Sequence, residues 1–167
     1  NDEEAIAIWK WFKEISMIEY TRVYELLNMT FDSYLGESYY RDQVSALVNE
    51  LENKGLLVES QGAKVIDLGK YNMPPCMITK SDGGSIYHSR DIAAVLYRKK
   101  SYDFEKCLYV TGLEQALHFK QVFKVIEIMG LAGSTPCIWR HKGLIDGLKD
   151  VKNVRLMGSG NANWLAA

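Results

Sequence analysis

The spacing of apolar residues predicts a long helix over residues 2–27. Apolar side chains recur there at intervals of three and four, and acidic residues crowd the first turn, where the helix dipole favours them. The apolar positions are Ile8, Trp9, Phe12, Ile15, Val23, Leu26 and Leu27. A second helix is predicted over residues 41–54, because its apolar positions share one face and Gly55 follows where a C-terminal cap belongs.

The pattern then changes to that of strands. The segments LLVES (56–60) and AKVIDL (63–68) are joined by a Gln-Gly turn and predict a hairpin. The segment CMITK (76–80) follows two prolines and predicts a further strand. The first half of the chain therefore predicts an α+β insertion or flanking layer.

Strands and helices alternate from residue 85 on. The segment SIY (85–87) predicts a short strand, residues 90–99 a helix, CLYVTG (107–112) a buried strand, and 114–129 a helix that stops at Gly130. This alternation with short connections is typical of a parallel α/β sheet, in which ligands bind beyond the carboxyl ends of the strands.

Composition and charge fit an ordinary globular protein. Hydrophobic residues make up 47% of the 167 residues, and the formal net charge is −1, so any contact with nucleic acid must be local. No apolar run approaches the roughly 20 residues of a membrane helix, and the acidic, amphipathic start is unlike a signal peptide. We expect a cytoplasmic protein with neither DNA nor a membrane as a partner.

The cysteines and histidines give no metal-site pattern. The three cysteines lie about 30 residues apart without a C-x-x-C pair, which favours reduced thiols over disulfides or a zinc site. The three histidines, His88, His118 and His141, lack ligand spacing. We therefore expect no metal site held by protein side chains.

Tyr87 and Asp91 lie four residues apart, where the predicted strand gives way to a helix. One interpretation is structural, because a carboxylate near a helix start is stabilised by the dipole and by free N–H groups. The other is functional. A phenol and a carboxylate at a strand's exit can converge on a cationic ligand, and the carboxylate matches a planar guanidinium.

A second candidate lies in VTGLEQALHFKQ (110–121). Gly112 follows a buried strand, which allows a ligand to approach the backbone, and the next helix presents its N-terminus. Gln115 and His118 are three residues apart and share a face of that helix, although such residues are often ordinary surface groups. Neither a dinucleotide fingerprint nor a P-loop is present. The basic run at 97–100 favours a helix end over an RNA contact.

The order of these motifs resembles the catalytic domain of arginyl-tRNA synthetase, a class I enzyme, in its bacterial form. The resemblance lies in KSDGGSIYHSRDIA (80–93) and YDFEKCLYVTGLEQALHFKQVFKVIEIMG (102–130), with upstream matches in FDSYLGESYY (31–40), LLVESQGAKVIDL (56–68) and MPPC (73–76). It covers residues 1 to about 130.

The resemblance implies a partial Rossmann-like sheet and a set of site residues. Tyr87, Asp91 and Gln115 would line the arginine pocket, with Asp91 paired to the guanidinium, and Gly112 and His118 would lie on the ATP side. The implied reaction is activation of L-arginine by ATP, with Mg²⁺ accompanying the nucleotide, and transfer to tRNA(Arg). Catalysis would come from positioning and charge stabilisation, so no residue is expected to act as a nucleophile.

The sequence also departs from the family. The HIGH-type and K-M-S-K-like signatures are absent, and the segment 131–167 matches no family motif, shows no helical or strand period and is expected to pack poorly. One hypothesis is that this tail is read out of frame, since codons for 134–139 can be chosen to give the family's motif one base later. The predicted parts are 1–75 (long helix and insertion), 76–130 (Rossmann-like catalytic half) and 131–167 (divergent tail).

These features predict part of an arginine–tRNA ligase that is inactive in isolation. A non-catalytic paralogue or relic that binds arginine or a protein partner is the alternative. A fragment with a purely structural role is a third possibility.

Overall fold

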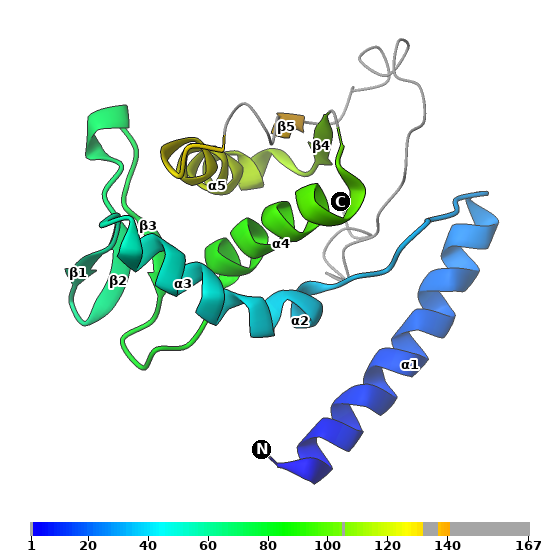
Figure 1. Ribbon diagram of the computed structural model, residues 1–167. Coiled ribbons are helices and arrows are strands. Elements are labelled where there is room, and N and C mark those ends of the chain that lie inside the picture. The colour runs from blue at the N-terminus through cyan, green and yellow to red at the C-terminus, as the bar shows by residue number, and fades with distance from the viewer. Residues whose placement is uncertain (1, 105, 132–136, 141–167) are drawn as a thin grey trace. The chain divides into compact units, whose positions relative to one another are not determined.

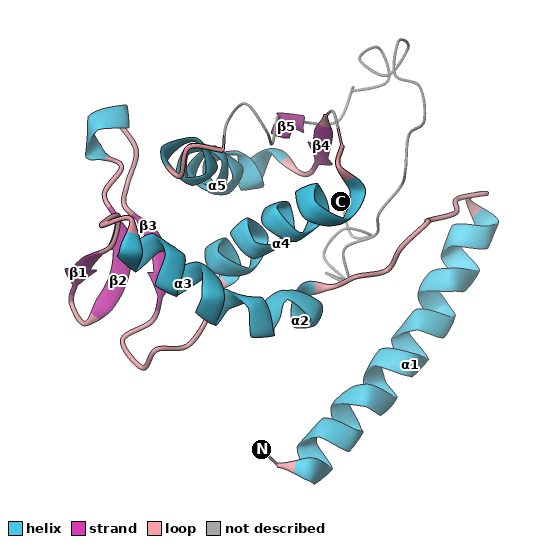
Figure 2. Cartoon of the chain, in the orientation of Figure 1, coloured by secondary structure: helices cyan, strands magenta, loops and turns pink. Residues whose placement is uncertain are grey.

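The computed structural model describes residues 2–104, 106–131 and 137–140 (Figure 1). By its contacts the chain divides into two compact units, one containing residues up to Tyr34 and the other beginning at Leu35. Helices account for most of the described chain, with short strands between them (Figure 2).

The first unit is built on helix α1 (Glu3–Leu26). Asp2 caps it, because Asp2 Oδ1 accepts the N–H of Ala5 over 3.1 Å, and two glutamates occupy the first turn. The helix predicted over 2–27 is therefore confirmed. Beyond it, the ring of Phe31 meets that of Tyr24 edge to face at 4.8 Å. In the described part of the chain, no helix combines the length and apolar character needed to cross a membrane.

The second unit contains a three-stranded antiparallel sheet with the order β1-β2-β3: β1 (Val58–Ser60), β2 (Ala63–Ile66) and β3 (Cys76–Thr79). Gln61 and Gly62 form the turn between β1 and β2 with φ of 53° and 78°, as a two-residue hairpin turn requires. The predicted hairpin and the third strand are confirmed. Strand β3 pairs antiparallel with β2.

Four helices of the second unit surround its core: α2 (Glu37–Tyr40), α3 (Val44–Asn53), α4 (Tyr87–Tyr102) and α5 (Ala116–Ile128). The helix predicted over 41–54 is present, but its first turn is a 3-10 turn at Arg41–Gln43. Gly55 ends α3 with a φ of 65°, a conformation that glycine adopts without strain, so its predicted capping role is confirmed.

The short strand predicted for residues 85–87 is wrong. Ser85 makes only an isolated bridge with Thr79, and α4 begins at Tyr87, three residues earlier than predicted. The cause is Ser89, whose hydroxyl accepts the N–H of Ile86 over 3.1 Å and donates to the Ile86 carbonyl over 3.0 Å. This local hydrogen bonding closes the first turn of the helix and favours helix over strand.

A parallel pair follows α4. Strand β4 (Cys107–Val110) pairs in parallel with β5 (Cys137–Arg140), and α5 lies between them in the sequence. A parallel arrangement was expected for β4, but its partner strand β5 was not predicted. The expectation that the tail lacks strand structure is wrong at residues 137–140. The remaining expectations for the tail concern residues outside the described ones.

The core of the second unit lies where α3, α4 and α5 pack with the two sheets. Helix α4 contacts α2, α3, α5 and β3. The largest fully buried aliphatic side chains come from α3, α4, α5, β3 and the segment that follows β2: Leu51, Leu68, Ile78, Ile92, Val95, Val122 and Val125. Each contributes roughly 1.5–3 kcal/mol relative to an exposed position. This packing fixes the faces that α4 and α5 turn toward each other.

Candidate functional site

The candidate site lies where the first two turns of α4 and α5 pack together. Each helix contributes two polar residues three positions apart, hence on one face: His88 and Asp91 from α4, and His118 and Gln121 from α5. The pairs meet in opposite order. His118 contacts Asp91, and Gln121 contacts His88.

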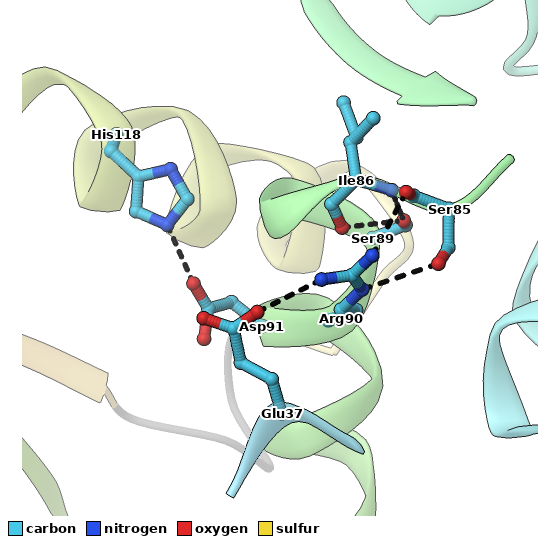
Figure 3. A network of polar contacts seen from close by, with 7 residues as sticks. All are labelled: Glu37, Ser85, Ile86, Ser89, Arg90, Asp91 and His118. Carbon is cyan, nitrogen blue, oxygen red and sulfur yellow. Dashed lines mark hydrogen bonds and ion pairs between the residues drawn. The ribbon is translucent and has the colours of Figure 1, made fainter. Parts of the chain in front are cut away.

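The Asp91 carboxylate and the His118 imidazole form the central contact. His118 Nε2 lies 2.6 Å from Asp91 Oδ2, and Figure 3 shows the two side chains pointing toward each other from the two helices. A carboxylate can only accept, so Nε2 carries the hydrogen. The Asp91 side chain is 30% exposed and that of His118 is 16% exposed. Among the described residues, Asp91 Oδ1 receives no hydrogen bond.

His88 and Gln121 form the second contact. His88 Nε2 lies 3.2 Å from Gln121 Oε1, and the His88 and His118 ring centroids are 4.5 Å apart. Burial lowers the pKa of His88 below its ordinary value, and the adjacent His118 lowers it further against the opposing effects of Gln121 and Asp91. His88 is therefore favoured as a neutral ring.

Tyr87 begins α4 and is 63% exposed. The guanidinium carbon of Arg90 lies 5.8 Å from the centroid of its ring. Arg90 is held by Glu37 at 2.9 Å and by the side chain and carbonyl of Ser85 at 3.2 and 3.1 Å (Figure 3). Within the described residues, Tyr87 makes no hydrogen bond to Asp91, although one helical turn separates them.

Gly112 and Gln115 lie in the connection between β4 and α5. Gly112 follows β4, and the Glu114 carboxylate lies against it, so a ligand reaching Gly112 would require this side chain to turn away. Gln115 precedes α5 and is exposed. Of the five predicted site residues, the structure joins Asp91 and His118 directly. It leaves Tyr87 and Gln115 open to solvent.

The structural interpretation of Asp91 as a helix-start residue does not match its position. Asp91 is the fifth residue of α4, and Ser89 caps the helix start instead. The basic run at 97–100 also has local partners. Arg98 is buried against Tyr109, and Lys99 bonds Asp103 and the Phe104 carbonyl. A buried contact with β4 accounts for Arg98, and partners at the helix end account for Lys99.

The sequence reasoning missed Gln121 and the role of His88. The available signal was the matching three-residue spacing of His88 and Asp91 on one helix and of His118 and Gln121 on the next. This spacing becomes informative only once the two helices are known to pack face to face.

Residues 1–163 match the model of a protein family described as "tRNA synthetases class I (R), catalytic domain". The chain belongs to this family. The match extends beyond residue 130, where the predicted resemblance ended.

Curated relatives agree with this assignment. The chain is 54% identical over 145 residues to an arginine–tRNA ligase of Clostridium beijerinckii, covering 87% of this chain and 26% of that protein. It is 50% identical over 160 residues to the arginine–tRNA ligase of Halothermothrix orenii, covering 94% and 28%. The chain thus spans about a quarter of the length of the synthetases that it matches.

Solved structures share the fold. The arginyl-tRNA synthetase of Plasmodium falciparum matches with a TM-score of 0.77 and 27% identity, over 90% of this chain and 28% of that one. A structure described as a putative arginyl-tRNA synthetase from Campylobacter jejuni matches with a TM-score of 0.69 at 17% identity, over 96% and 42%. The α/β fold class predicted from the sequence is confirmed as that of class I synthetases.

Proposed function

We propose that this chain supplies the arginine-recognising part of an arginine–tRNA ligase, which activates L-arginine with ATP and transfers it to tRNA(Arg). The Asp91 carboxylate carries this proposal. His118 holds one of its oxygens, the other has no donor among the described residues, and the side chain is 30% exposed. A planar guanidinium presents paired N–H groups that fit such a carboxylate.

Tyr87 and Gln115 would complete the arginine pocket. The Tyr87 ring is exposed, which supports its use as an aromatic wall for a planar cation. Gln115 is exposed at the start of α5, where its amide can accept from the substrate's N–H groups. Both residues are open to solvent, so a bound substrate can reach them.

ATP would lie beside Gly112 and His118, at the end of β4 and the start of α5. Class I synthetases use ATP, and a helix start with free N–H groups favours anionic phosphate oxygens. Mg²⁺ would accompany the nucleotide. The described residues contain no group of three or more side chains suited to hold a metal ion, so we assign it no protein ligand. We place this ligase in the cytoplasm, where tRNA is charged for translation.

The test is arginine-dependent exchange of pyrophosphate into ATP by a full-length ligase that carries this segment. We expect Asp91→Asn to lower kcat/KM for arginine at least about tenfold, because the charge that faces the guanidinium is lost. Asp103→Asn is the matched control, since Asp103 is an exposed aspartate at the end of the same helix. Equal loss in both variants, or no loss in Asp91→Asn, would refute the proposal.

A further inference from the structure

Gln121 is a buried amide with a fixed orientation. It is 6% exposed, and its nitrogen lies 2.9 Å from the carbonyl oxygen of Pro74 and 3.2 Å from that of Pro75. Carbonyl oxygens only accept, so the nitrogen must face them and use both of its hydrogens there. The amide oxygen is therefore turned toward His88.

This orientation determines the hydrogen on His88. Because Gln121 Oε1 can only accept, His88 Nε2 must donate across their 3.2 Å contact. Burial and the neighbouring His118 lower the pKa of His88, which keeps the ring neutral in this role. The two prolines before β3 thus fix the His88 ring through one glutamine.

The His88 ring in turn confines His118. The two ring centroids are 4.5 Å apart with an angle of 49° between the planes, and Phe119 meets the His118 ring edge to face at 4.9 Å. With these two rings in contact, His118 keeps the orientation in which Nε2 donates to Asp91 Oδ2.

We propose that Gln121 and His88 are positioning residues for the Asp91 carboxylate. They hold His118, and His118 engages Oδ2, so that Oδ1 is the oxygen left for a guanidinium. The contacts that link Gln121, His88, His118 and Asp91 are present without a substrate. The guanidinium as the ligand depends on the function proposed above. A carboxylate held in one rotamer binds a planar cation without first losing side-chain freedom.

The first experiment needs no substrate. In the 167-residue chain with ¹⁵N-labelled histidine, NMR measures how fast the His118 ring N–H exchanges with water. Gln121→Met keeps the side-chain length but removes both amide groups, and we expect exchange to accelerate at least about tenfold as the ring loosens. Lys120→Met introduces the same residue at the adjacent exposed position and should leave the rate within about twofold of the parent.

A second variant covers the case in which Gln121→Met does not fold. His88→Phe keeps an aromatic ring against His118 but loses the hydrogen bond to Gln121, and we expect exchange at least about threefold faster than in the parent. An unchanged rate in a folded Gln121→Met chain overturns the proposal. If only His88→Phe folds, an unchanged rate there overturns it.

The second experiment separates the positioning role from the substrate. In a full-length ligase carrying this segment, Gln121→Met should raise KM for arginine by at least about fivefold, with kcat less affected and Lys120→Met unchanged. If the parent shows no arginine-dependent exchange, the proposed function fails while the NMR result stands. If the parent responds to arginine and Gln121→Met has the parent's KM, the positioning role fails.

Discussion

Tyr109 of β4 accepts a hydrogen bond from the guanidinium of Arg98 in α4, over 2.7 Å. Both residues are buried, at 8% and 9% exposed, and the guanidinium carbon lies 5.3 Å from the Tyr109 ring centroid. This contact ties the helix that carries Asp91 to the strand that leads into α5. It therefore supports the relative position of the two site helices.

Tyr109→Phe should destabilise the fold by about 1–3 kcal/mol, because it leaves a buried charged donor without its acceptor. Urea unfolding of the 167-residue chain, followed by circular dichroism, measures the change. Tyr39→Phe is the control, since the Tyr39 hydroxyl donates to Tyr97 at the exposed surface and should matter little. If both substitutions have the same small effect, the Arg98–Tyr109 bond does not stabilise the fold.

Stability should fall as the pH drops below the ordinary histidine pKa of 6.5, because His88 has a lowered pKa in the folded chain. Between the folded and unfolded pKa values the unfolded chain binds more protons, so the contribution present above pH 6.5 is lost on acidification. His88→Phe removes this group, and its thermal midpoint should depend less on pH between 7.5 and 5 than that of the parent. Identical pH dependence in the two chains would contradict this assignment.

The fold's local features could be predicted from the sequence because they depend on neighbouring residues. The Gln61-Gly62 turn and the cap at Gly55 could be predicted because glycine readily adopts the positive φ that both positions have. The start of α4 could not be placed, because the Ser89 hydroxyl that closes its first turn acts from inside the helix. The antiparallel pairing of β3 was also missed, since strand pairing depends on contacts that no local pattern specifies.

The candidate site divides in the same way. Asp91 and His118 could be named from residue type, position and family resemblance, but their hydrogen bond depends on how α4 packs on α5. Gln121 was missed because its three-residue spacing from His118 is uninformative until α4 and α5 are known to pack together. Its meaning comes from two proline carbonyls more than forty residues away in the sequence.

The Cys76 thiol should be unreactive in the folded chain. Burial raises its pKa from 9.0 to about 12, which lowers the reactive thiolate fraction about a thousandfold at pH 8. Iodoacetamide labelling followed by peptide mass spectrometry should find Cys76 modified only after unfolding in urea. Rapid labelling of Cys76 under native conditions would show that β3 opens to solvent.

Arginine and citrulline separate the charge of the substrate from its shape. Citrulline has nearly the same shape, but a neutral urea group replaces the guanidinium, so it cannot form a charge pair with Asp91. In a full-length ligase carrying this segment, the parent should prefer arginine by roughly 30- to 4,000-fold in kcat/KM, which corresponds to about 2–5 kcal/mol for a desolvated charge pair.

Asp91→Asn should greatly reduce this preference. The amide keeps the shape of the side chain but offers no charge, so arginine loses its advantage while citrulline loses little. The difference between the two substrates in the two enzymes isolates the charge pair, as a double-mutant cycle does. Pyrophosphate exchange measured with both amino acids gives the four values. A preference for arginine that survives Asp91→Asn unchanged would place the guanidinium against another residue and leave Asp91 as a partner of His118 alone.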